Sequence, residues 1–195
     1  MLLNPVTVIE DNEGNIKGSI DTFSRNFNEG NIYLVGEIDD EMAMSIVAQF
    51  LDLDYRMGGV KNGEERITLI INSPGGSVSA GLAIYDTMRS ISTPVRTLCV
   101  GTAASMAAVI LAGGNERMMM PHSEVMIHQP SGGAMGKTSD ILIAADHIRD
   151  TRQTLIEILS EKTGKSVSEV ARDIELDKWM KPQEALDYGL IDRIY

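Results

Sequence analysis

Short apolar runs alternate with helical patterns along the chain, and this alternation restricts the fold more than any other feature of the sequence. Residues 67–71 are β-branched or aliphatic almost throughout, which is typical of a strand buried on both faces. They lead into Asn72-Ser73-Pro74-Gly75-Gly76 and then into a helical pattern over 77–89. The same pattern predicts further strands over 31–38, 94–100 and 124–128, and helices over 39–51, 103–112, 139–162 and 182–188, with a short one after the capping box at 166–169. Strands that alternate with helices predict an α/β fold with largely parallel strands.

The domain organisation is simple. A chain of 195 residues suits one domain with a substantial core, and it contains no internal repeat or long linker. Residues 10–30 are polar and rich in Asn, Gly and Asp, so we expect an N-terminal arm over 1–30, its polar part mobile, and a single domain over 31–195. A glycine-containing loop is expected over 58–63.

Charge and apolar content exclude some partners. The formal net charge of −11 repels phosphate backbones, so we expect no nucleic acid as partner. The longest apolar run, over 103–112, is far below the ~20 residues that span a bilayer. The first residues lack the pattern of a secretion signal, and the single cysteine, Cys99, fits a reducing compartment. These features predict a cytoplasmic protein that does not enter a membrane.

Ser105 is the first candidate for chemistry, although its surroundings alone favour a structural role. It lies in an alanine-rich apolar stretch, where a serine hydroxyl usually bonds to a carbonyl one helical turn earlier. A catalytic serine needs three further things: a base, an acid that orients the base, and donors for an oxyanion.

The base has three candidates and the acid has three more. His128 stands where an apolar strand gives way to a loop, a place where α/β sheets position chemistry. His122 lies in a loop and His147 within the long helical pattern, so both are weaker choices. Among the acids of residues 171–179, the pattern alone does not choose between three of them: Asp173, Glu175 and Asp177.

The glycine turn that follows the buried strand over 67–71 could supply oxyanion donors. Glycines let the backbone approach a ligand and direct N–H groups at it, although a simple tight turn explains them equally well. A phosphate loop is rejected, because the chain has neither a Walker lysine nor a G-x-G-x-x-G spacing. The chain also lacks H-E-x-x-H and any Cys/His cluster, so no metal is expected in the chemistry.

Three segments, 71–76, 101–106 and 126–130, resemble the proteolytic subunits of the Clp protease family (ClpP), and the likeness extends from about Val8 to Tyr195. The resemblance implies a serine endopeptidase with Ser105 as nucleophile and His128 as base. It also implies Asp177 as the acid and the backbone N–H groups of Gly76 and Met106 as oxyanion donors. No cofactor would take part in the chemistry.

The family resemblance also implies an architecture and partners. The fold would be a superhelix of ββα units, related to that of crotonases, with a protruding strand–helix handle over about 129–162. Two heptameric rings would stack into a homo-oligomer around a chamber. A hexameric AAA+ unfoldase would consume ATP and feed unfolded polypeptides through an axial pore, which the N-terminal arm would line.

The sequence departs from the family outside these motifs. Thr68, Ile70 and Ser90 replace bulky residues of the cleft where the unfoldase docks, and Leu176 replaces an arginine that makes contacts between rings. A related capsid-maturation protease of a phage or prophage is therefore an alternative. Less favoured alternatives are an acyl-CoA enzyme of the crotonase fold and a ring subunit without activity of its own.

Overall fold

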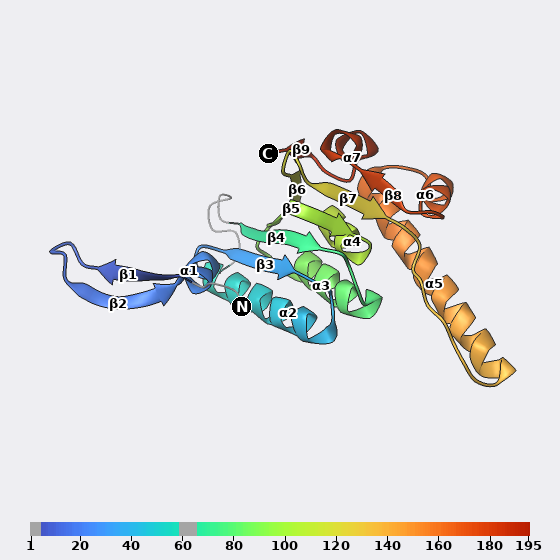
Figure 1. The fold of residues 1–195 in the computed structure, drawn as a ribbon, viewed down its shortest axis with the longest axis horizontal. Helices are drawn as coiled ribbons and strands as arrows, with labels where there is room; N and C mark the ends of the chain where they lie inside the picture. Colours follow the sequence, from blue (N-terminus) through green and yellow to red (C-terminus); the bar gives the residue numbers. More distant parts are fainter. Residues whose placement is uncertain (1–4, 59–65) are drawn as a thin grey trace.

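A mostly parallel sheet forms the centre of the protein (Figure 1), in a computed structural model that describes residues 5–58 and 66–195. Its main path runs through β3 (Asn31–Val35), β4 (Ile67–Ser73), β5 (Val95–Ala104), β6 (Glu116–Met119) and β9 (Arg193–Ile194). All neighbours along this path pair in parallel. The α/β fold predicted from the alternation is confirmed, although the sequence pattern did not predict β6 or β9.

The sheet divides at β5. The first half of this strand pairs with β6, and its second half pairs in parallel with β7 (Glu124–Ile127). A short strand, β8 (Lys178–Met180), then pairs with β7 in the antiparallel direction. β7 and β8 therefore form a branch of the sheet that departs from the carboxyl end of β5.

The core lies between the sheet and three helices: α2 (Asp40–Met57), α3 (Val78–Ser90) and α4 (Met106–Ala112). Helix α2 begins where the Asp39 carboxylate accepts a hydrogen bond from the backbone N–H of Met42, which satisfies a donor at the helix end. Every residue of α4 is buried, so its wholly apolar sequence is matched by its position in the core.

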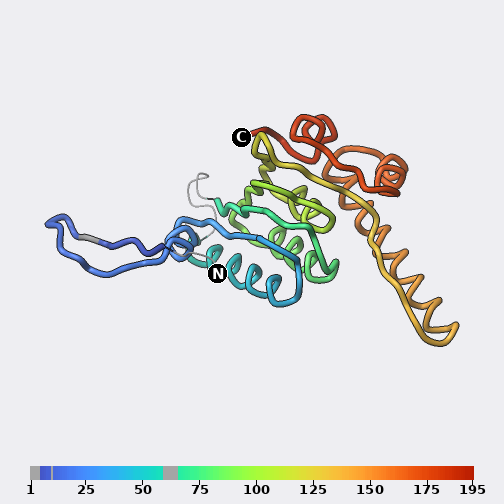
Figure 2. Tube along the Cα trace, viewed as in Figure 1, coloured from blue at the N-terminus to red at the C-terminus, as the bar shows by residue number. Residues whose placement is uncertain are grey.

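The N-terminal segment contains regular structure, whereas the composition of residues 10–30 predicts a mobile arm. β1 (Val6–Glu10) and β2 (Ile16–Asp21) form an antiparallel hairpin, and α1 (Thr22–Asn28) connects it to the body. In Figures 1 and 2 the hairpin projects from one end of the molecule.

A long helix, α5 (Thr138–Thr163), projects at the other end (Figures 1 and 2). Residues 129–137 run beside α5, and a side chain added at Gly132 would meet Ile148 of that helix. This segment was expected to contain the strand of a strand–helix handle. The structure has no strand there, so only the helical part of the handle is present as expected.

Two short helices, α6 (Val167–Asp173) and α7 (Pro182–Tyr188), flank β8 and complete the fold. The loop expected over 58–63 falls outside the described residues from 59 onward. Across residues 5–58 and 66–195, none of the helices is long and apolar enough to span a membrane.

Candidate active site

Ser105 lies at the junction between β5 and α4. The sequence pattern places it inside a helix over 103–112, and this prediction is wrong because β5 continues to Ala104 and α4 begins only at Met106. Ser105 has φ 55° and ψ −123°, the one positive φ among the described residues other than glycine. Such a conformation is costly for a serine and is usually found where function requires it. Because of this sharp turn, Ser105 lies before the first turn of α4 and not within the helix.

Strand register brings Ser105 together with two residues from distant parts of the chain. Parallel pairing of β5 with β7 ends at Ala104 and Met126, and the Ser105 N–H donates to the Met126 carbonyl at 2.8 Å. Antiparallel pairing sets Ile127 of β7 opposite Lys178 of β8. Continuing this register by one residue places His128 opposite Asp177, at the edge of the sheet where Ser105 stands.

The three side chains form a continuous hydrogen-bonded row. His128 Nε2 lies 2.8 Å from Ser105 Oγ, and His128 Nδ1 lies 3.1 Å from Asp177 Oδ1. The His128 side chain is 26% exposed and that of Asp177 is 61% exposed, so the acid end of the row faces solvent. An imidazole held by a carboxylate at one nitrogen presents the other nitrogen to the serine as a proton acceptor.

The other acids and histidines considered from the sequence are not in this row. Asp173 forms an ion pair with Lys178 at 3.3 Å, and Glu175 contributes its backbone carbonyl to a hydrogen bond with Gln129. His122 is exposed in the turn between β6 and β7. His147 lines a separate cavity between α3 and α5. Only one of the three candidate acids, Asp177, therefore contacts a candidate base.

The glycine turn after β4 packs directly against Ser105. A Cβ added at Gly75 would lie 2.7 Å from both the Ala104 carbonyl oxygen and Ser105 Cβ, and 3.1 Å from the Met106 nitrogen. A Cβ at Gly76 would lie 2.2 Å from the Ile38 carbonyl oxygen. Glycine is required at both positions because the backbones on either side approach so closely.

The backbone N–H groups of Gly76 and Met106 have no hydrogen-bond acceptor within residues 5–58 and 66–195. Met106 is the first residue of α4, where an N–H has no partner inside the helix. The residues on either side of Gly76 bond to Ile38, so these contacts do not use the Gly76 N–H. The Ile38 N–H donates to the Gly75 carbonyl at 2.8 Å, and the Ser77 N–H donates to the Ile38 carbonyl at 2.8 Å. Two donors are thus left available beside the Ser105 turn.

Gln129, the residue after His128, holds the turn that carries Asp177. Its backbone N–H donates to the Ile174 carbonyl at 2.7 Å, and its side-chain amide donates to the Glu175 carbonyl at 3.3 Å. The sequence pattern did not predict a role for Gln129, because no local pattern indicates that a side chain will bind the backbone of a distant turn.

Arg152 of α5 secures Gln129 from the other side. Its Nε donates to Gln129 Oε1 at 3.2 Å, and its Nη2 donates to the Ala171 carbonyl in α6 at 3.0 Å. The long helix is therefore linked, through one arginine and one glutamine, to the turn that carries the acid.

The space beside the row is small and apolar. Ser105 and His128 line a cavity of about 20 Å³ together with apolar side chains from α3, α4 and α5: Val78, Met106, Val109, Leu155 and Leu159. The described residues contain no group of three or more His, Cys, Asp or Glu that could hold a metal ion. Burial raises the pKa of the Cys99 thiol, which disfavours the thiolate that a cysteine nucleophile needs.

The chain is similar to a known protein family. A family model described as Clp protease matches residues 13–195, nearly the whole chain. The matched range includes the β5–α4 turn, the end of β7 and the turn before β8, so every residue of the hydrogen-bonded row lies inside it.

Proposed function

The chain belongs to the Clp protease family, and on that premise we propose that it is a serine endopeptidase whose nucleophile is Ser105. The observation that carries the proposal is the row of contacts from Ser105 through His128 to Asp177. Nucleophile, base and orienting acid are the three parts that acyl-enzyme catalysis requires.

Each residue of the row has a defined part in the proposed reaction, and His128 acts first as a base and then as an acid. The Ser105 oxygen attacks the peptide carbonyl carbon while His128 Nε2 takes the hydroxyl proton. The C–N bond then breaks, and the proton moves from Nε2 to the leaving amine. In the second half of the reaction, water attacks the ester carbonyl, gives its proton to His128, and Ser105 regains its proton as the acid product leaves. Asp177 accepts the hydrogen bond from Nδ1–H and stabilises the imidazolium formed in each half.

The oxyanion that forms at the carbonyl needs donors, and we assign them to the N–H groups of Gly76 and Met106. Both lie beside the Ser105 turn without another acceptor in the described structure. A donor at the first residue of a helix gains from the partial positive charge at that end. No cofactor or metal has a role in these steps.

We further propose that the chain acts within an assembly. Members of this family form rings with unfoldase partners, and two stacked heptameric rings around a chamber is the arrangement we expect here. Unfolded polypeptides would enter the chamber after an AAA+ unfoldase, which uses the ATP, has extended them. Leu176, which is 81% exposed beside Asp177, is the departure most able to alter contacts between rings.

A fluorophosphonate probe tests the nucleophile directly. It should label the wild-type protein at one serine and should not label Ser105→Ala, since only a serine activated by a base reacts readily with such probes. Sizing the wild-type protein before labelling separates an unassembled sample from an inert one. An assembled wild-type sample without label at Ser105 would contradict the proposed function.

Substituting each histidine tests the choice of base. His128→Ala should lower kcat for a short peptide by about 10⁴-fold or more, because the serine then has no proton acceptor. His122→Ala and His147→Ala are matched controls and should retain hydrolysis of the same peptide. If His122→Ala lost as much kcat as His128→Ala while its assembly stayed intact, the assignment of His128 as the base would be wrong.

A further inference from the structure

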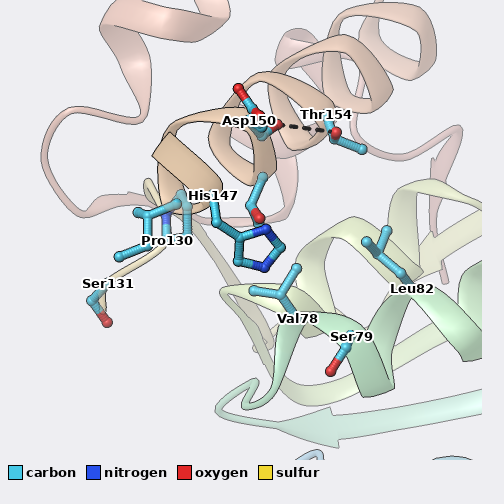
Figure 3. A pocket seen from close by; sticks show the side chains of 10 residues that line it. Val78, Ser79, Leu82, Pro130, Ser131, His147, Asp150 and Thr154 are labelled. Carbon is cyan, nitrogen blue, oxygen red and sulfur yellow. Dashed lines mark hydrogen bonds between the residues drawn. The ribbon is translucent and has the colours of Figure 1, made fainter. Parts of the chain in front are cut away.

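Two of the cavities lie at opposite ends of the parallel strands. The one drawn in Figure 3, between α3 and α5, adjoins the space beside Ser105 through Val78 and Pro130 and belongs to the surroundings of the candidate active site. The other, of about 540 Å³, lies where β4 and β5 begin. Arg96 in its wall and Ser105 are roughly 30 Å apart along β5. The proposed reaction makes no use of this second cavity, whose volume is in the range of small-molecule sites.

Strand register gathers polar and cationic side chains in the wall of the second cavity. Thr68 of β4 pairs with Arg96 of β5, which pairs in turn with Glu116 of β6. Paired residues of neighbouring strands point to the same face of a sheet, and Arg66, two residues before Thr68, points to that face as well. Arg66, Thr68 and Arg96 all line the cavity.

Arg66 and Arg96 carry more positive charge than their partner in the protein neutralises. They bind the Glu116 carboxylate at 2.6 Å and 2.8 Å, and Arg193 binds the same carboxylate at 3.0 Å. Across residues 5–58 and 66–195, no other carboxylate forms an ion pair with these three arginines. Two positive charges are therefore left without a counter-charge, in a chain whose formal net charge is −11.

The two guanidinium groups of the wall also have unused hydrogen-bond donors. Arg66 donates to Glu116 through Nη1, and Arg96 donates to it through Nε. Among the described residues, their other nitrogens have no acceptor, and the Thr68 hydroxyl has no hydrogen-bond partner. A guanidinium presents five N–H donors in a planar fork that matches the oxygens of an oxyanion. This part of the wall therefore has the charge and the donors to bind one.

The other charged side chains of the wall are already paired. Arg56, near the end of α2, contacts Asp52 at 2.9 Å within the same helix. Glu29, the acid among the described lining residues, contacts Arg25 at 3.5 Å. These two pairs balance each other in charge, so the excess positive charge of the wall is that of the two strand arginines.

The size and the rest of the lining indicate what carries the oxyanion. A phosphate ester is nearly dianionic at pH 7 and has three terminal oxygens, so it matches two uncompensated charges and several free donors. A free phosphate ion would fill only a small part of about 540 Å³. Leu53 and Met57 add an apolar part to the wall, which an attached organic group would cover.

We propose that the cavity at the beginning of β4 and β5 binds a small organic molecule that carries a phosphate group. Arg66 and Arg96 hold the phosphate through charge-assisted hydrogen bonds, and the Thr68 hydroxyl donates a further one. The site is remote from Ser105, so the proposal goes beyond the peptidase function and does not depend on it.

Calorimetric titration of the assembled protein with phenyl phosphate tests the site. At about 0.1 M salt, the wild-type protein should bind this probe with a Kd below about 1 mM. Inorganic phosphate should bind at least about 3-fold more weakly, because it lacks an organic group to cover the apolar wall. Ser105→Ala should bind phenyl phosphate as the wild type does. A wild-type protein that does not bind phenyl phosphate would overturn the proposal, and equal affinity for inorganic phosphate would overturn its organic part.

Removing either arginine tests which groups hold the phosphate. Arg66→Gln and Arg96→Gln should each raise the Kd for phenyl phosphate about 10-fold or more, since charge-assisted hydrogen bonds are lost. Glu116 keeps two arginine partners in each variant, and a folding defect in one variant leaves the other to decide. Arg149→Gln is the matched control, because it removes the same charge from α5, where Arg149 pairs with Asp146. It should keep the wild-type Kd.

Two results with these variants would contradict the assignment. If folded Arg66→Gln and Arg96→Gln both bound phenyl phosphate with the wild-type Kd, the arginines would serve only to bind Glu116. A short peptide of glutamates could instead bind the wild type more tightly than phenyl phosphate and lose this affinity in both variants. The cavity would then belong to an acidic segment of a protein partner and not to a phosphorylated small molecule.

Discussion

Ser105 shows how much a single backbone conformation can determine. Its φ of 55° turns the chain between a strand and a helix within one residue, and Gly75 fits against the turn with no room for a side chain. The cost of this conformation, of order 1–3 kcal/mol, must be met by the surrounding structure. The close approach of Gly75 is one of the contacts that hold it.

Replacing Gly75 with alanine tests this contact. The added Cβ would collide with Ala104 and Ser105, and Gly75 itself has φ 95°, which an alanine rarely adopts. We expect Gly75→Ala to lower the free energy of unfolding by about 1–3 kcal/mol and to slow fluorophosphonate labelling of Ser105 at least 10-fold. Urea unfolding and labelling rates measure the two effects.

Gly18→Ala is the control for Gly75→Ala. Gly18 has no positive φ and no heavy atom within 4 Å of an added Cβ, so its substitution should change neither quantity. Labelling of Gly75→Ala at the wild-type rate would mean that Gly75 does not hold the Ser105 turn.

For single residues, the sequence predicted which side chains could take part in catalysis more readily than it predicted their backbone conformations. Chemical type and position make Ser105 and His128 candidates, although the surroundings of Ser105 alone favour a structural role. The residues themselves do not distinguish Asp177 from Asp173 and Glu175. That choice depends on the register of β7 with β8 and on the hydrogen bonds of Gln129, which are tertiary properties. The resemblance to a family is what assigns the role of the acid to Asp177.

Among the elements, α5 is linked to the site through the hydrogen bonds of one of its side chains. Its Arg152 binds both Gln129 and the carbonyl of Ala171, and Gln129 in turn binds the turn before Asp177. A displacement of α5 would therefore be transmitted to the contact between His128 and Asp177.

Gln129→Ala and Arg152→Ala test this transmission. Both should lower kcat for a short peptide by about 10- to 100-fold with little change in KM, because the acid turn would lose its position while the substrate-binding surface remained. Arg152→Lys retains a donor and should give an intermediate kcat. Steady-state kinetics on assembled protein measures these values.

The control for the pair is Gln153→Ala on the same helix, whose side-chain amide donates to the exposed Glu157. Its kcat should match the wild type. If Arg152→Ala raised KM and left kcat unchanged, the link would concern substrate binding and not the position of Asp177.

The element boundaries that the sequence predicted well are those with local signals. A capping aspartate precedes α2, a capping box opens α6, and glycines follow α5 and α7. The apolar run 103–112 has no such signal and no polar face, so its pattern did not distinguish the end of β5 from the start of α4. β8 and β9, with three and two residues, are too short to show a period.

For the molecule as a whole, Glu116 joins parts of the chain that are far apart in sequence. Its carboxylate contacts Arg66 at 2.6 Å, Arg96 at 2.8 Å and Arg193 at 3.0 Å, and so connects the edge of β4 with β5, β6 and β9. Hydrogen bonding from Arg96, which outweighs the effect of burial, lowers the pKa of Glu116, and the charges of all three arginines act in the same direction.

The lowered pKa gives a pH-dependent contribution to stability. Because the folded-state pKa lies below the unfolded value of about 4.3, the contribution is complete above that value and is lost as the pH falls through the folded pKa. Glu116→Gln should lower the free energy of unfolding by about 1–3 kcal/mol at pH 7, and by less as the pH falls below about 4. Urea titrations at several pH values measure the difference.

Glu157→Gln provides the comparison, since Glu157 is exposed and its carboxylate accepts a hydrogen bond from Gln153. It should change stability little at any pH. A Glu116→Gln protein with wild-type stability at pH 7 would show that solvent stabilises the three arginines as well as the Glu116 carboxylate does.

The hairpin at one end and α5 at the other leave the single chain with more surface than its mass requires. It exposes 11,023 Å², whereas a compact monomer of 21.3 kDa exposes about 9,100 Å². In an interface of ordinary size each partner buries about 800 Å², so the excess of about 1,900 Å² would suffice for roughly two such interfaces. Since association would remove this surface from water, the midpoint of thermal unfolding should rise with protein concentration.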